Sequence, residues 1–217
     1  MKQGNEVSPV EARSKGVEYA SGLGIAVGGA STRMGHPKGL LEVEAGVTIL
    51  SRLWELALDV LPEKQVRLLG NNAAYSEADY PFLEDARKGE GPLGGIVALL
   101  GFAERASLNR VVVLSCDLPY LSHELLVRLL EEAQAAPRDA IVCPKVDGFY
   151  LPFFASYPVQ RSAEFRAALA KGHGRLQGLI AGGRQQELIL SEAETQLLDD
   201  WDRPADLPDD HPFRADK

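Results

Sequence analysis

The sequence predicts an α/β protein, a three-layer Rossmann-like fold with a mostly parallel central sheet, and three observations lead to this. Short strand-like runs alternate with helix-like segments at short connections, an order typical of a parallel sheet with helices on both faces. Val111–Leu114 is apolar and β-branched without polar alternation, as expected for a strand buried on both faces. A chain of 217 residues with 45% apolar residues suits one such domain with a substantial core.

The first half of the chain supplies five expected elements. They are a strand at Leu23–Val27, a helix at Thr48–Leu61, strands at Val66–Leu69 and Phe82–Glu84, and a helix at Leu93–Ala106. The first helix places its apolar residues on one face, and Pro62 ends it because proline cannot continue a helix.

The second half continues the alternation. Expected here are a strand at Val111–Leu114, a helix from Ser122 to about Ala136, a strand at Ala140–Cys143, an extended stretch at Phe149–Phe154, helices near Gln160–Ala170 and Leu176–Ile180, and a strand at Leu188–Leu190. Ser191 with Glu194 has the spacing of a capping box, which predicts one more short helix.

Residues 22–207 are expected to form a single domain, between a flexible leader at residues 1–21 and a tail at residues 208–217. The formal charge is 23 − 31 = −8, which argues against a nucleic-acid or anionic-membrane partner. No apolar run approaches the ~20 residues of a membrane span, and the polar N-terminus has no signal core. Two cysteines without metal or redox spacing indicate reduced thiols. We therefore expect a cytoplasmic protein.

The loop after the first strand, Gly28–Lys38, combines glycines with Arg33 and Lys38. Glycines let backbone N–H groups approach an anion closely, and the two cations suit a triphosphate. The loop has neither the Walker spacing nor the dinucleotide fingerprint. Phosphate binding is the favoured interpretation, and a plain structural turn is the alternative.

Two acids follow other strands of the expected sheet. Asp85 lies at a strand end, where it could accept from a ribose hydroxyl or a base, although a solvated turn is as good an interpretation. Asp117 follows the strand expected to be most buried, where a carboxylate is costly unless it is paired. Beside a phosphate loop its natural partner is Mg²⁺, and the alternative is that Asp117 caps the following turn before Pro119.

The acidic run Asp199–Asp206 near the C-terminus would ordinarily be solvated. Trp201 within it indicates an ordered segment, from which Asp202 could reach a second cation. No Ser/His/Asp or Cys/His set has a recognisable spacing in this chain, so nucleophilic catalysis is not indicated.

Several segments together resemble a known family. Ala26-Val-Gly-Gly-Ala-Ser-Thr-Arg-Met-Gly-His-Pro-Lys-Gly-Leu-Leu41 is similar to the nucleotide-binding signature of the molybdenum cofactor guanylyltransferases, a branch of the nucleotidyltransferase superfamily. Gly91–Gly95, Cys116–Pro119 and Asp202–Leu207 resemble later motifs of that family in the same order. The resemblance covers about residues 22–207 and implies a fold of nucleotidyltransferase type.

The resemblance also implies roles for individual residues. The nucleotide would be bound by Ala26, Val27, Gly28, Gly29, Arg33, Lys38, Asp85 and Asp117. Arg33, Lys38 and Asp117 would be catalytic, and Asp117 would hold Mg²⁺ on the phosphates. Two family asparagines, thought to face the pterin, are replaced here by Asp200 and Asp202, which are therefore the candidate acceptor-binding residues.

The implied reaction is Mg²⁺-dependent transfer of GMP from GTP to the molybdopterin cofactor, with release of pyrophosphate. Implied protein partners are molybdoenzymes or cofactor-handling proteins. Pro37 stands where the family usually has Asp, and this with Asp202 keeps two alternatives open: CMP transfer to the same cofactor, or nucleotide transfer to a sugar phosphate. A non-catalytic nucleotide-binding adaptor is a third, less favoured interpretation, since both Lys38 and Asp117 are present.

Overall fold

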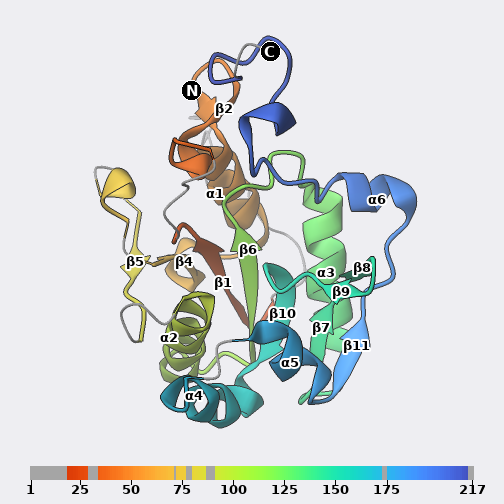
Figure 1. The fold of residues 1–217 in the computed structure, drawn as a ribbon. Coiled ribbons are helices and arrows are strands. Elements are labelled where there is room, and N and C mark those ends of the chain that lie inside the picture. The colour runs from red at the N-terminus through yellow and green to blue at the C-terminus, as the bar shows by residue number, and fades with distance from the viewer. Residues whose placement is uncertain are drawn as a thin grey trace, which may run out of the picture.

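A computed structural model describes residues 19–28, 34–70, 72–76, 80–86, 91–172 and 175–214. Seven strands form its central sheet in the order β11-β7-β10-β6-β1-β4-β5 (Figure 1). Their bounds are β1 Ser21–Ala26, β4 Val66–Leu69, β5 Phe82–Leu83, β6 Arg110–Ser115, β7 Ile141–Cys143, β10 Phe154–Pro158 and β11 Gln185–Glu187. All neighbouring pairs are parallel except those of β10, which runs antiparallel to β6 and β7. The predicted mostly parallel sheet is confirmed.

Helices cover both faces of the sheet, which makes the expected three layers (Figure 1). The helices are α1 Ile49–Val60, α2 Pro92–Arg105, α3 His123–Ala135, α4 Ser162–Ala170, α5 Leu176–Ala181 and α6 Glu192–Gln196. Strand β6 alternates between two cores: Val112 and Leu114 belong to the core with α1 and α3, and Val111 and Val113 to the core with α2 and α4. All four side chains are fully buried, which explains why the strand has no polar alternation.

Two short hairpins and several 3-10 turns lie outside the central sheet. They are hairpin β2 Glu42–Glu44 with β3 Val47–Thr48, hairpin β8 Lys145–Val146 with β9 Phe149–Tyr150, and the 3-10 turns η1 Lys38–Leu40, η2 Glu63–Gln65, η3 Ala73–Tyr75, η4 Val159–Arg161 and η5 Pro204–Asp206. The β8–β9 hairpin turns through Asp147 and Gly148, both at positive φ, the conformation that two-residue hairpin loops favour. None of the described helices has the length and apolarity to cross a bilayer.

Most expected elements agree with the structure, and the expected helix caps at Ser122 and Ser191 are present. The prediction of a strand at Leu188–Leu190 was wrong. The residues that pair with β7 are the polar Gln185–Glu187. Leu188 is buried and donates one backbone bond to Cys143, so its apolar character reflects packing rather than strand pairing. The extended stretch at Phe149–Phe154 is divided between β9 and the start of β10.

Candidate active site

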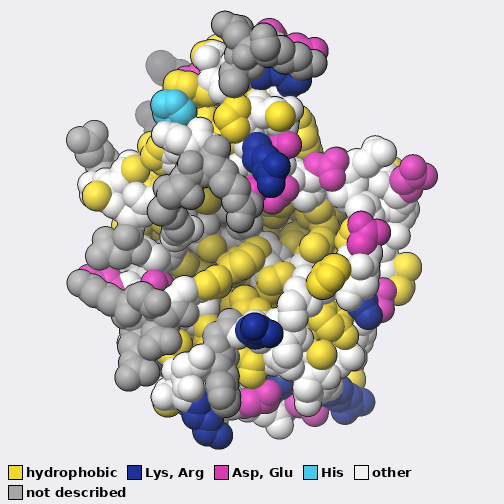
Figure 2. All heavy atoms as spheres, in the orientation of Figure 1, with side chains coloured by type: hydrophobic (Ala, Val, Ile, Leu, Met, Phe, Trp, Pro, Cys, Tyr) yellow, Lys and Arg dark blue, Asp and Glu magenta, His cyan; other side chains and the backbone are white. Residues whose placement is uncertain are grey.

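The candidate site is a pocket beyond the carboxyl ends of β1, β4 and β6, which parallel pairing brings to one edge of the sheet. Its volume is about 390 Å³. Figure 2 shows a hollow on this face with a largely apolar floor. The lining residues are Ala26, Val27, Gly28, Lys38, Leu69, Gly70, Asp85, Gly91, Pro92, Gly95, Ile96, Ser115, Cys116, Asp117, Phe153 and Asp202.

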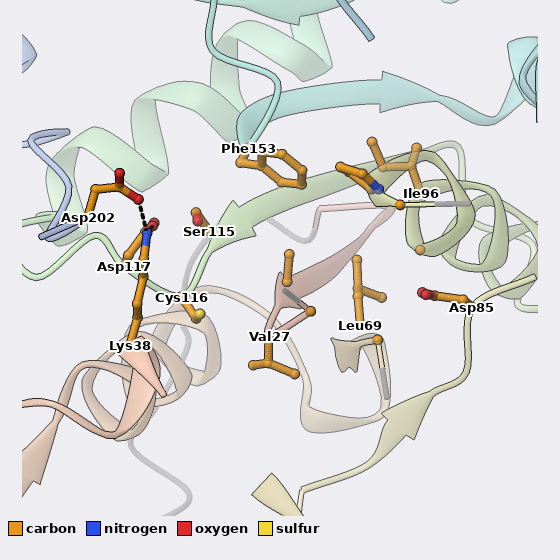
Figure 3. A pocket seen from close by; sticks show the side chains of 16 residues that line it. Val27, Lys38, Leu69, Asp85, Ile96, Ser115, Cys116, Asp117, Phe153 and Asp202 are labelled. Atoms are coloured by element: carbon orange, nitrogen blue, oxygen red, sulfur yellow. Dashed lines mark hydrogen bonds and ion pairs between the residues drawn. The ribbon is translucent and has the colours of Figure 1, made fainter. Parts of the chain in front are cut away.

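One end of the pocket is charged. Lys38 Nζ lies 2.7 Å from Asp117 Oδ2 and 2.6 Å from Asp202 Oδ1, so one ammonium bridges two carboxylates (Figure 3). Burial lowers the pKa of Lys38, but the hydrogen bonds to Asp117 and Asp202 outweigh it, and the net pKa is raised. Lys38 is therefore held as a cation at this end.

A third acid, Asp200, joins the charged end. One carboxylate oxygen each from Asp117, Asp200 and Asp202 lies within 4.8 Å of the others. Desolvation, with the nearby Asp117 carboxylate adding to it, raises the pKa of Asp200. Three carboxylates around one ammonium leave an excess of negative charge, and hard divalent cations such as Mg²⁺ prefer such oxygen ligands. The donor set therefore fits the expected metal.

Trp201 holds the C-terminal acids in place. Its side chain is only 2% exposed, and its backbone N–H donates to the Asp117 carbonyl at 3.1 Å. Its indole Nε1 donates to the Tyr120 hydroxyl at 3.2 Å. The acidic run is thus ordered, as Trp201 indicated, and Asp200 and Asp202 flank a buried anchor.

A buried tyrosine supports the turn that carries Lys38. The Gly39 N–H donates to the Tyr75 hydroxyl at 3.0 Å. A Cβ at Gly39 would lie 3.0 Å from that hydroxyl and 3.3 Å from Cys116 Cβ, so a larger residue here would press on both neighbours. Burial raises the pKa of Tyr75 well above its ordinary value and that of Cys116 to about 12. Both side chains therefore stay neutral beneath the charged cluster.

The opposite end of the pocket holds Asp85 (Figure 3). Burial raises the pKa of this half-buried carboxyl. Between Asp85 and the charged end, Leu69, Ile96 and Phe153 line the pocket with apolar surface. Gly70 has φ +101°, and a Cβ there would lie 3.1 Å from the backbone of Gly28, so the loops after β1 and β4 approach closely only because Gly70 has no side chain.

The structure gathers most of the residues expected from the sequence. Ala26, Val27, Gly28, Lys38, Asp85, Asp117 and Asp202 line the pocket, and Asp200 lies within the acid cluster. Gly29 and Arg33 lie outside the described residues. Sequence reasoning did not assign Leu69, Gly70, Ile96, Ser115 or Tyr75 to the site. Leu69, Gly70 and Ser115 lie at or just after expected strands, and this position could have indicated them. Ile96 lies in the first turns of the helix expected at Leu93–Ala106, and no local signal marks Tyr75.

A mostly parallel sheet with a pocket at its carboxyl edge, charged at one end and largely apolar between its ends, defines an α/β protein with a ligand site of the kind that binds nucleotides. The chain belongs to the family of MobA-like NTP transferase domains, whose model matches residues 24–188. It is therefore a nucleotidyltransferase.

Two similar curated proteins are named as molybdenum cofactor guanylyltransferases, one of them as a probable one. The chain is 30% identical over 184 residues to a molybdenum cofactor guanylyltransferase from Pseudomonas putida, covering 80% of this chain and 88% of that one. It is 30% identical over 181 residues to a probable molybdenum cofactor guanylyltransferase from Bacillus cereus, covering 82% and 86%. A crystal structure of molybdopterin-guanine dinucleotide biosynthesis protein A from Archaeoglobus fulgidus is similar in fold, with a TM-score of 0.68, 21% identity, and 85% and 93% coverage.

Proposed function

We propose that the protein transfers GMP from GTP to the molybdopterin cofactor and releases pyrophosphate. The observation that carries the proposal is the polarity of the pocket, with Lys38 and its acids at one end and the Asp85 carboxylate at the other. A nucleoside triphosphate has the matching polarity, since its phosphates need cations and its base needs a directional polar partner. The names of the similar guanylyltransferases support the choice of GTP and of the acceptor.

The end of the pocket that holds Asp85 is assigned to the base, and it favours guanine. Guanine presents two adjacent donors, N1–H and the N2 amino group, and one carboxylate can accept from both. The other three bases present no such pair, because each places an acceptor beside its donor. Asp85 is the carboxylate at this end of the pocket, and it is the residue we assign to guanine. Glycine at position 95 leaves room there, since a Cβ would lie 3.3 Å from Asp85 Oδ1.

The charged end is assigned to the triphosphate. Lys38 is the cation at this end among the pocket residues, and Arg33, from the same loop, is proposed to assist it. Gly28 and Gly29 are proposed to let backbone N–H groups approach the phosphates. These groups act by position and charge, which is the main contribution of proteins to phosphoryl-type transfer.

The expected metal is Mg²⁺, held by Asp117 with Asp200 and Asp202 as further donors. When bound, Mg²⁺ neutralises negative charge on phosphate oxygens. The reaction needs no covalent enzyme intermediate: a phosphate oxygen of the acceptor bonds to the α-phosphorus of GTP, and the bond from that phosphorus to the bridging oxygen breaks. The acceptor is proposed to enter beside Asp200 and Asp202, at the outer side of the charged cluster.

Two measurements test the proposal. In thermal-shift titrations with Mg²⁺, GTP is expected to raise the Tm more than CTP, UTP or ATP, because a ligand that binds only the folded state stabilises it. Pyrophosphate release is then followed with molybdopterin cofactor and with sugar phosphates as acceptors. A larger shift with CTP, or release with a sugar phosphate alone, would favour the alternative transferases. Binding without pyrophosphate release over the whole panel would identify a non-catalytic nucleotide-binding protein.

A further inference from the structure

Lys38 already supplies a cation to the acids assigned to the metal. Its Nζ contacts Asp117 Oδ2 at 2.7 Å and Asp202 Oδ1 at 2.6 Å, and both acids belong to the three-carboxylate cluster. The contacts are shielded, since the side chains of Lys38 and Asp117 are only 15% and 12% exposed. An ammonium in such a position neutralises part of the charge that would attract a divalent ion.

The same lysine is also assigned to the triphosphate. One ammonium cannot keep both of these short contacts and also move to a polyphosphate. A metal that took oxygens from Asp117 and Asp202 would face repulsion from Lys38 at this range, since two like charges a few ångströms apart in a partly buried site repel strongly. A triphosphate offers Lys38 other anionic partners and thereby frees the two carboxylates.

We propose that Lys38 is the resident cation of this acid cluster, and that divalent metal replaces it only when a nucleoside triphosphate draws the lysine away. The protein then takes up metal together with nucleotide rather than before it. This inference rests on the proposed function of the site and adds the order of binding. It also predicts that the cluster becomes a metal site by itself once the lysine charge is removed.

The test measures Mn²⁺ binding to the full chain by electron paramagnetic resonance of free Mn²⁺, without substrate turnover. The wild type is expected to bind Mn²⁺ weakly alone and at least about tenfold more tightly with a non-hydrolysable GTP analogue, after subtraction of binding to the analogue itself. Lys38→Met is expected to bind Mn²⁺ at least about tenfold more tightly than wild type without any nucleotide. Lys38→Arg, which keeps the charge, is expected to stay weak.

Controls separate the site from the rest of the surface. Lys64→Met removes an exposed lysine outside the pocket and should bind Mn²⁺ as the wild type does. Adding Asp117→Asn to Lys38→Met should abolish the gain. If Lys38→Met loses stability, the inference still predicts that Mn²⁺ raises its Tm more than it raises the Tm of the wild type.

The proposed replacement of Lys38 by metal would be overturned by either of two results. One is equal Mn²⁺ affinity of wild type and Lys38→Met without nucleotide, and the other is tight Mn²⁺ binding by Lys38→Arg. The proposed function is judged separately by pyrophosphate release from the wild type. If the wild type is active but binds Mn²⁺ tightly without nucleotide, only the proposed order of binding is refuted. If it releases no pyrophosphate with any acceptor, the proposed function is refuted.

Discussion

The two ends of the pocket are built on different principles. The charged end joins Lys38 to acids 79 and 164 positions away in the chain, and its character comes from the balance of charge. At the other end, the ion pairs among the described residues do not include Asp85, which lies beside Leu69, Gly95 and Ile96. That end is defined by shape and by one carboxylate.

Because the two ends differ in this way, we expect the charged end to control the reaction rate and the Asp85 end to control the choice of nucleotide. Groups that stabilise the departing phosphates act mainly in the transition state, so their loss lowers kcat and kcat/KM together. Groups that bind the base act equally before and during the reaction, so their loss raises KM and weakens discrimination. The two ends should therefore respond to matched substitutions in distinguishable ways.

The largest effect is expected from Asp117→Asn at the charged end. The substitution removes the acid that we assign to the metal, and we expect kcat to fall by roughly 10²–10³-fold or more. The fold should persist, because Trp201 bonds to the backbone carbonyl of residue 117 and Lys38 retains Asp202. Pyrophosphate release measures the rate and thermal unfolding the stability. Asp59→Asn, an exposed acid on α1, is the matched control, and wild-type rates in Asp117→Asn would refute the metal role.

A smaller effect on affinity, with a change in selectivity, is expected from Asp85→Asn at the other end. An amide replaces one acceptor by a donor, and losing a bidentate base contact costs about 1–3 kcal/mol. The KM for GTP should rise about 5- to 150-fold, with little change for CTP or ATP. Glu84→Gln, an exposed neighbour, controls for the loss of charge. Unchanged preference for GTP in Asp85→Asn would remove Asp85 from base recognition.

Asp85→Asn should also change how stability depends on pH. Burial raises the pKa of Asp85 above its unfolded value, so the folded state binds more protons than the unfolded state. Stability then falls as the pH rises through the titration of this carboxyl. The amide removes that contribution, so in urea unfolding the stability of Asp85→Asn relative to wild type should increase as the pH rises across the acidic range.

Much of this architecture follows from local sequence. Strand β6 is recognisable because Val111–Leu114 is apolar throughout, and a strand buried on both faces has to be. Once the strands are placed, parallel pairing brings their carboxyl ends together, and this is why Lys38, Asp85 and Asp117 could be expected near one another. The cap at Ser191 is similarly local, since the box needs only Ser191 and Glu194 at the correct spacing.

Other features depend on contacts between distant segments. The register of β11 is set by pairing with Ile141–Cys143, and the apolar Leu188 gave a misleading signal next to it. Nothing near Tyr75 in the sequence indicates that its hydroxyl meets Gly39, because that contact arises only when η3 and η1 pack together. Likewise, Asp200 reaches the charged end only because Trp201 is buried against Tyr120.

The smallest effect on activity is expected from Tyr75→Phe. This substitution tests whether the charged end depends on the position of the turn that carries Lys38 as well as on its charge. The substitution leaves the buried Gly39 N–H without its acceptor, at a cost of about 1–3 kcal/mol in the free energy of unfolding. Lys38 begins the same turn, so a small displacement of its ammonium should lower kcat and kcat/KM together by a few-fold. Tyr80→Phe, on a tyrosine that stacks on Trp54 outside the pocket, should change neither. A large fall in kcat for Tyr75→Phe would show that the position of Lys38, and not only its charge, limits the rate.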